Sequence, residues 1–299
     1  MLKIQRRDVL FTLLGQLILD GIVTGLVYVI LAVGLVLILS VSRIFFIAYG
    51  QFYMLGAYIV WGSLTLLKVP YFVGLLMAIA ATTLLGLLCY QFIFRYIQYR
   101  GSFLANIVAA IGLMMIMGQA GLLIFGTIAR SVPPVFPGIL SIANISIPVE
   151  KLILVILTIF IALIAFFIYE KMKLGRAMRA VSLHPEAATL QGVKTNRIYL
   201  ATMGFGCALA GFGGGVMAPV YVIYPEMGTN IILSVLLVIM LGGQGSMLGA
   251  VLGGLVLGIT LVFGQYFLGG LAQIFLFVVI GIILFFRPGG LLGHAELEI

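Results

Sequence analysis

Apolar residues form long runs along the chain, separated by short polar stretches. Most of the runs approach the roughly 20 residues that an α-helix needs to cross the hydrocarbon core of a membrane. They cover residues 9–42, 44–67, 71–94, 104–125, 149–169, 198–220, 229–243, 247–268 and 270–286. Residues 152–164 are apolar at almost every step, whereas a transmembrane β-strand alternates apolar and polar side chains. The pattern therefore predicts an all-α, polytopic transmembrane helical bundle of eight to ten spans.

Composition supports a single transmembrane domain over residues 1–299. Of the 299 residues, 64% are hydrophobic and 8% are charged, which is far from the composition of a soluble domain. The formal charge of +8 does not indicate nucleic-acid binding, because the basic residues are scattered at the ends of apolar runs. Cys89 and Cys207 lie inside apolar runs, where packing is the expected role.

Lys and Arg mark the loops expected on the cytoplasmic side. One basic loop holds Arg95 and Arg100, and a larger one lies between Lys171 and Arg197. Basic residues also precede the first run and follow the last, so both termini are predicted to be cytoplasmic. The run at 9–42 must then supply two short or partly re-entrant passes.

A short sequence in the first half of the chain is echoed in the second half. Residues 50–57 read Gly-Gln-Phe-Tyr-Met-Leu-Gly-Ala, and residues 243–250 read Gly-Gln-Gly-Ser-Met-Leu-Gly-Ala. Each copy follows one apolar run and opens another, which predicts two discontinuous or re-entrant helices. Paired breaks of this kind indicate a central translocation site. The alternative is that the small residues only allow close helix packing.

The segment 175–193 is the strongest polar signal in the chain. Pro185 suits the first position of a helix, Glu186 suits its first turn, and Gly192 can end it. This predicts a short surface helix whose Ala187 and Ala188 fit a groove of another protein. Leu190 and Val193 are predicted to add an apolar anchor. The alternative is a solvated connector.

These residues resemble the Glu-Ala-Ala-x-x-x-Gly coupling motif of bacterial ABC importer permeases. Glu186, Ala187, Ala188 and Gly192 match it, and residues 175–180 resemble the branched-chain amino acid permease family in particular. The resemblance continues through Asp20–Gly21, residues 46–58, 241–250 and 287–293. It implies that the loop docks on an ATPase subunit. The residues assigned to that contact are Arg176, Arg179, Pro185, Glu186, Ala187, Ala188, Leu190 and Gly192.

The segment at 46–51 departs from that family. Family members typically have a histidine where this chain has Tyr49, and often an acid where it has Gln51. A neutral and aromatic pathway would suit aromatic acids, amides or urea-like solutes as alternatives to branched-chain amino acids. The candidate pathway residues are Tyr49, Gln51, Tyr53, Tyr58, Asn230, Gln244 and Ser246. Isolated amides such as Gln119 and Gln265 are expected to bond between helices.

Ionisable residues are almost missing from the apolar runs, Asp20 being the exception. A proton- or sodium-coupled carrier usually needs buried acids, so their scarcity indicates that a partner supplies the energy. No nucleophile–base constellation, metal-ligand spacing or phosphate-binding loop occurs in the sequence. We therefore expect a transport subunit without enzymatic activity, cofactor or metal of its own.

The resemblance implies the rest of the assembly. A second related permease chain would complete the pathway, and two cytoplasmic ATPase subunits would bind ATP and Mg²⁺. A periplasmic binding protein would deliver the solute to this inner-membrane protein, which would work by alternating access. The alternatives from other classes are a stand-alone channel, a secondary carrier and a membrane-embedded enzyme.

Overall fold

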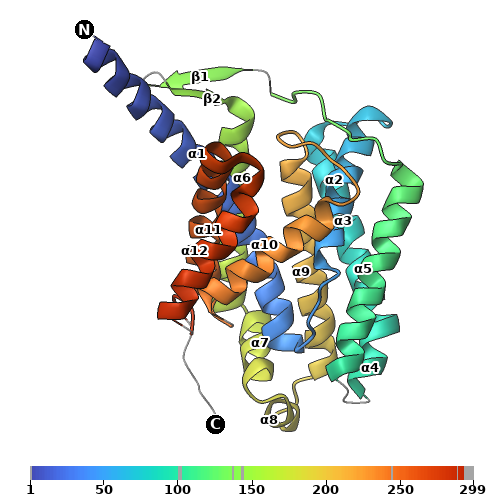
Figure 1. Ribbon diagram of the computed structural model, residues 1–299. Coiled ribbons are helices and arrows are strands. Elements are labelled where there is room, and N and C mark those ends of the chain that lie inside the picture. Colours follow the sequence, from blue (N-terminus) through green and yellow to red (C-terminus); the bar gives the residue numbers. More distant parts are fainter. Residues whose placement is uncertain are drawn as a thin grey trace.

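The chain forms a bundle of long helices whose centre is built from α1, α2 and α9 (Figure 1). The computed structural model describes residues 2–99, 103–136, 138–142, 145–243, 245–287 and 289–292. Its elements are α1 (Leu2–Leu37), η1 (Ile38–Ser42), α2 (Tyr49–Thr65), α3 (Tyr71–Cys89), η2 (Tyr90–Phe94), α4 (Arg95–Tyr99), α5 (Phe103–Phe125), β1 (Ile139–Ile142), β2 (Ile145–Pro148), α6 (Val149–Lys171), α7 (Lys173–Leu183), α8 (Pro185–Leu190), α9 (Thr195–Met217), α10 (Met227–Gly242), α11 (Met247–Leu268), η3 (Gly269–Leu271) and α12 (Ala272–Phe286).

Helical structure agrees with the predicted fold class, and a short antiparallel hairpin of β1 and β2 is the addition. Among the described residues, six helical segments are long and apolar enough to cross a membrane. The protein is thus a multi-pass membrane protein, but the predicted eight to ten spans are not confirmed. The last of the six segments, Met247–Phe286, contains both α11 and α12, which pack against each other.

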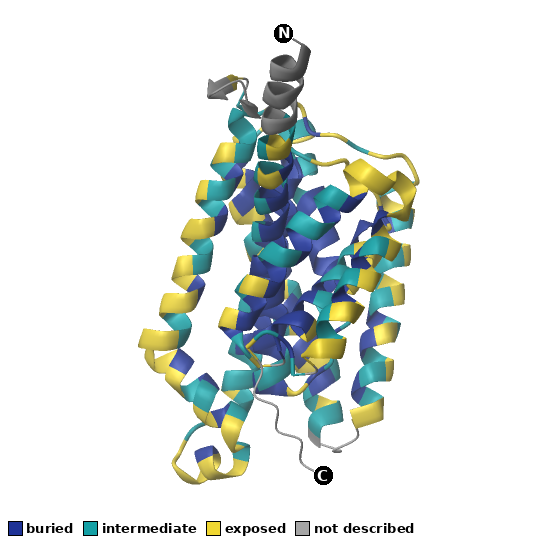
Figure 2. Cartoon of the chain, turned by 60° about the vertical axis from the view of Figure 1, so that its left-hand side comes forward, coloured by how far each residue is buried: buried dark blue, intermediate teal, exposed yellow. Residues whose placement is uncertain are grey.

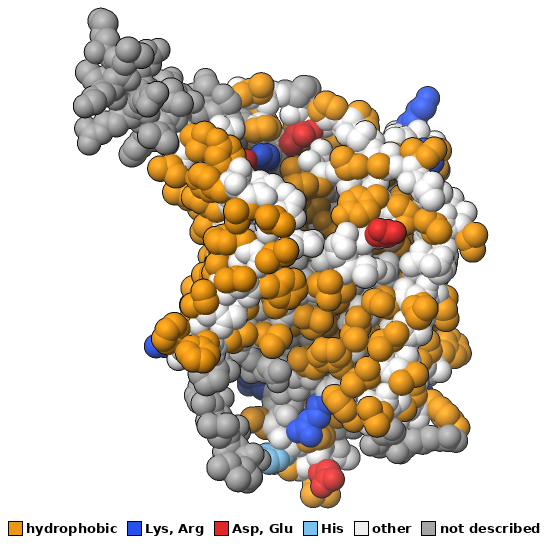
Figure 3. Space-filling view, viewed as in Figure 1, with side chains coloured by type: hydrophobic (Ala, Val, Ile, Leu, Met, Phe, Trp, Pro, Cys, Tyr) orange, Lys and Arg blue, Asp and Glu red, His pale blue; other side chains and the backbone are white. Residues whose placement is uncertain are grey.

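Burial separates central from peripheral helices. In α1 and α9, 78% of the most apolar window is buried, compared with 17% in α5 and α6. Figure 2 shows this as a buried centre surrounded by exposed outer helix faces. Apolar side chains cover the middle of the face in Figure 3, and charged ones lie mainly toward its ends. Exposed apolar faces at that level are expected for helices that contact lipid.

The first apolar run is one crossing and not two. Leu13–Ser42 forms a single continuous helical segment that ends at Arg43. The start of α1 lies at the hairpin end of the bundle, whereas the ends of α12 and η1 lie toward the α8 end (Figure 1). The prediction of two passes within residues 9–42 is therefore wrong, because the described part of this run is one continuous helical segment. A basic stretch before an apolar run does not by itself fix the number of turns within the run.

The two predicted helix breaks have different settings. Before α2, residues 44–48 run through the core, where Ile44, Phe46 and Ala48 are buried, so α2 begins inside the bundle. The second break, between α10 and α11, is a turn at the α8 end, where Gly243 and Gly245 have positive φ. Only the first break therefore lies inside the bundle, and it is a discontinuous crossing in which residues 44–48 are not helical and α2 completes the path.

Small residues allow the central helices to approach closely. A Cβ on Gly25 of α1 would lie 3.0 Å from backbone atoms of α11, and Gly258 of α11 likewise leaves no room. The starts of α2 and α10 meet in the same way, because the backbones of Gly50 and Gly228 touch. Such contacts replace the hydrophobic effect as the source of helix association within lipid.

Candidate functional site

A cavity of about 640 Å³ opens between the helices of the described part of the chain. It lies between α1, α2, α9, α10, α11 and α12, and the segment 218–226 forms one wall. Its lining residues are Thr24, Val27, Tyr28, Tyr53, Met217, Tyr221, Val222, Tyr224, Met227, Asn230, Ile231, Ser234, Leu261, Gln265, Gly269, Gly270, Ala272 and Gln273.

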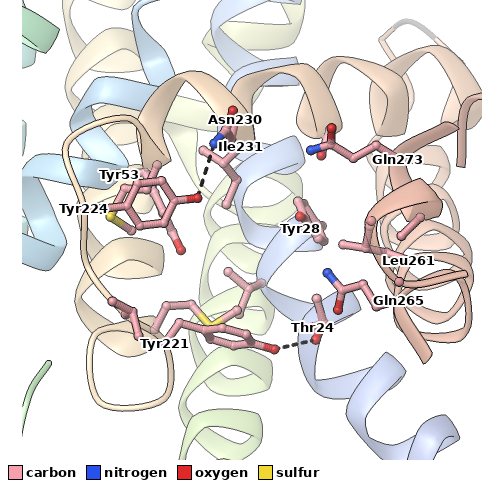
Figure 4. Close-up of a pocket in the computed structure, with 18 residues that line it drawn as sticks. Thr24, Tyr28, Tyr53, Tyr221, Tyr224, Asn230, Ile231, Leu261, Gln265 and Gln273 are labelled. Atoms are coloured by element: carbon pink, nitrogen blue, oxygen red, sulfur yellow. Dashed lines mark hydrogen bonds between the residues drawn. The ribbon is translucent and has the colours of Figure 1, made fainter. Parts of the chain in front are cut away.

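Hydrogen bonds hold the polar lining in place (Figure 4). Thr24 Oγ1 and the Tyr221 hydroxyl are 3.1 Å apart, which ties the 218–226 wall to α1. Asn230 Nδ2 donates to the Tyr224 hydroxyl at 3.3 Å, which ties the same wall to α10. The amide groups of Gln265 and Gln273 point toward the space between these helices.

The outside of that wall is fixed by a second segment. Arg130 and Ile223 exchange two backbone hydrogen bonds of 2.8 Å each. The guanidinium carbon of Arg130 lies 4.9 Å from the ring centroid of Trp61, within the range of a cation–π interaction. Ile223 is fully buried, while Tyr221, Val222 and Tyr224 line the cavity.

The lining mixes polar and apolar groups and carries no formal charge. Hydroxyl and carboxamide groups alternate with apolar side chains, and no Asp, Glu, Lys or Arg is among the lining residues. Such a surface binds small solutes through hydrogen bonds and shape rather than through ion pairs. Among the described residues, no group of three or more His, Cys, Asp and Glu is arranged to hold a metal ion.

Two of the predicted pathway residues, Tyr53 and Asn230, line this cavity. Tyr49 is buried in the core with its hydroxyl toward Gly34, and Gln51 donates to Thr229 Oγ1 at 3.1 Å. Tyr58 stacks on Phe125 with ring centroids 3.9 Å apart.

The echoed residues of the second copy lie elsewhere. Ser246 caps α11 by accepting from the Gly249 amide at 3.0 Å. Gln244 lies outside the described residues.

Most of the cavity residues carry no local sequence pattern that assigns them to a pathway. Tyr28, Tyr221 and Tyr224 are examples, and the position of Gln265 within an apolar run predicts a hydrogen bond between helices instead. The available signal was the presence of polar side chains inside or beside membrane-spanning runs, where they need polar partners or water. Residues from six α-helices form the lining, so no local pattern could bring them together.

The predicted surface helix is present as α8, at the opposite end of the bundle from the β-hairpin (Figure 1). It begins at Pro185, and Gly192 follows it with a φ of 84°. Leu190 is 90% exposed, and Glu186 and Ala187 are exposed as well. Leu183, the last residue of α7, is 72% exposed as well, and several exposed apolar side chains on one polar loop are suited to contact with another protein.

The prediction that both Ala187 and Ala188 are free to enter a groove of another protein is wrong for Ala188. It is 4% exposed and packs with Val41, Met178 and Val181 in a small core between η1, α7 and α8. Arg179 also acts within the chain, since its guanidinium donates to the Tyr169 carbonyl at 2.6 Å and pairs with Glu170. Arg176 is exposed. The chain thus holds α8 on a packed base and presents Ala187 and Leu190.

Comparison with known proteins agrees with this arrangement. The family described as "Branched-chain amino acid transport system / permease component" matches residues 17–286. The chain belongs to this family. The match includes α8 and every helix that lines the cavity.

Relatives with established names support the same assignment. The high-affinity branched-chain amino acid transport system permease protein BraD of Pseudomonas aeruginosa is 27% identical, over 95% of this chain and 97% of its own length. LivH of Escherichia coli K12 is 26% identical, over 95% and 96%. A probable branched-chain amino acid transport permease of Methanocaldococcus jannaschii is 28% identical over 82% and 79%. No solved structure matches the chain significantly.

Proposed function

We propose that this protein is a membrane-embedded subunit of an ATP-driven importer for branched-chain amino acids or related small solutes. Membership of the permease family supports the class of transporter. The geometry of α8 is the observation that supports coupling to an ATPase. α8 stands on a small packed core and exposes Leu190 to 90%, so a force applied to α8 is transmitted to α7, η1 and α9.

The assembly follows from this role. Two ATPase subunits, which bind ATP and Mg²⁺, dock on the α8 helices of this chain and of a second related permease. The end that carries α8 then faces the cytoplasm of a bacterial inner membrane. A periplasmic binding protein delivers the solute at the hairpin end. Closure of the ATPase dimer moves the α8 helices and switches the accessible side of the cavity.

The residues that line the cavity indicate which class of solute it can hold. Its uncharged lining suits a zwitterion or a neutral solute, and its four tyrosines also suit aromatic acids and amides. Tyr49 and Gln51 depart from the family pattern but do not line the cavity. Their replacement therefore does not argue against branched-chain amino acids as the transported class.

Substitution of Leu190 tests the proposal. We expect Leu190→Asp to abolish ATP-driven uptake of labelled leucine in proteoliposomes that contain the whole importer, because the charge disrupts an apolar contact with the ATPase. Membrane insertion and the thermal unfolding midpoint should not change, since Leu190 contacts little of its own chain. The control is Leu66→Asp, a 73% exposed leucine at the hairpin end.

The result separates the importer from the alternatives. A stand-alone channel or a secondary carrier would transport equally well with Leu190→Asp and without ATP. Full uptake by that variant would exclude α8 as the docking element. Uptake of phenylalanine or an amide but not of leucine would retain the class and replace the substrate.

A further inference from the structure

A second and smaller cavity lies at the α8 end of the bundle, between α4 and the start of α9. Its volume is about 150 Å³, which is large enough for a phosphate group. Its lining residues are Arg95, Gln98, Thr195, Asn196 and Tyr199. None of them lines the large cavity.

Two π-helical turns build this corner of the molecule. η1 is followed by Arg43, which has a φ of 53° although it is not a glycine, and η2 is followed by Arg95. Gln98 Nε2 donates to the Ser42 carbonyl at 2.7 Å and holds the two turns together. Arg43 lies close enough to the Tyr199 hydroxyl to interact with it electrostatically. Single π-turns and left-handed non-glycine residues concentrate at functional sites.

Hydrogen-bond donors converge here, and no acid is among the described residues that line the cavity. The Tyr90 hydroxyl lies 2.7 Å from Asn196 Oδ1, which directs the Asn196 amide group to donate elsewhere. The ion pairs between described residues join Lys151 to Asp20 and Arg179 to Glu170, and neither involves Arg43 or Arg95. A guanidinium with neighbouring amide and hydroxyl donors matches the oxygens of a phosphate group.

We propose that this cavity binds the phosphate group of an anionic ligand, either a phospholipid headgroup or free phosphate. Tyr199 connects this cavity to α8, because it also packs against the small core that contains Ala188 of α8. An occupied cavity holds the start of α9 and the base of α8 together. This consequence for coupling rests on the proposed function, whereas binding itself does not.

Binding is tested with the full chain in lipid nanodiscs. We expect added phosphatidylglycerol to raise the thermal unfolding midpoint above its value in pure phosphatidylcholine. Arg95→Gln should raise, by about tenfold or more, the phosphatidylglycerol content needed for half of this rise in midpoint. The reason is that it removes the charge-assisted hydrogen bonds. Asn196→Asp should do the same, since it keeps the acceptor for Tyr90 and adds a repelling charge. Lys173→Gln, an exposed cation on α7, is the control and should respond like the unmodified chain.

Comparison of inorganic phosphate with phosphatidylglycerol identifies the source of the phosphate group. If inorganic phosphate stabilises the chain in pure phosphatidylcholine and phosphatidylglycerol adds nothing, the ligand is soluble. Equal responses of all four proteins would show general surface electrostatics and would overturn the site, as would no response to either anion. The variants are compared with their own midpoints in phosphatidylcholine, so a loss of basal stability does not imitate a loss of binding.

Discussion

Ala187 and Ala188 are identical neighbours in α8 with opposite environments. Each residue of an α-helix is rotated by about 100° from the one before, so adjacent side chains face different directions. Ala187 is exposed, while Ala188 is buried against Val41, Met178 and Val181. One alanine is therefore available to a partner, and the other belongs to the chain's own packing.

Arginine at these two positions should produce two different defects. Ala187→Arg is expected to fold with an unchanged thermal midpoint but to lose ATP-driven uptake and co-purification of the ATPase. Ala188→Arg should fail to accumulate in the membrane, because an unpaired charge in a small core costs several kcal/mol. Blot quantification and uptake measured side by side check both. Normal uptake by Ala187→Arg would mean that this face of α8 contacts nothing.

At the scale of elements, the contact between the starts of α2 and α10 fixes where α2 begins inside the bundle. Backbone atoms of Gly50 and Gly228 touch, and the Gln51 side chain bonds to Thr229 beside them. A side chain at either glycine would have to displace backbone rather than a flexible group. The sequence echo around Gly50 thus reflects close packing at this position, which is the alternative that the sequence left open.

Alanine scanning of glycines should distinguish this contact from ordinary helix positions. We expect Gly50→Ala to destabilise the protein by about 1–3 kcal/mol, the usual cost of overpacking a core. Gly112→Ala in α5 is the matched control, because a Cβ there meets nothing within 4 Å. It should be neutral or slightly stabilising, since alanine favours helix more than glycine does. Thermal unfolding in detergent measures both, and equal midpoints would contradict the proposed contact.

At the scale of the whole molecule, the single crossing by Leu13–Ser42 sets which ends share a side. The start of α1 lies with the β-hairpin, and α8 lies at the other end (Figure 1). An internal ion pair also marks the hairpin end, where Lys151 of α6 lies 2.7 Å from Asp20 of α1. The one acid within an apolar run is thereby neutralised by a partner from another helix.

Topology labelling should confirm this arrangement. In a background with Cys89→Ala and Cys207→Ala, a membrane-impermeant maleimide should label Ser131→Cys from outside intact cells. Thr189→Cys should react only in inverted vesicles, because α8 is expected to face the cytoplasm. An epitope tag placed ahead of Met1 should be accessible from the same side as position 131. If the tag is instead accessible only in inverted vesicles, as position 189 is expected to be, residues 9–42 would contain two passes.

The sequence by itself determined the helical membrane fold, the helix breaks at residues 49 and 243–246, and the α8 helix, which begins at Pro185 and ends before Gly192. These features depend on run length, apolar character and the local effects of proline and glycine, all of which act within a few turns. Only the tertiary structure decided that residues 9–42 cross once. It also placed Tyr49, Gln51 and Ala188 in packing contacts, and it gathered Tyr28, Tyr221 and Gln273 around one cavity. The physical reason is that burial and cavity lining depend on which helices meet, and the chain encodes those meetings through contacts between residues far apart in sequence.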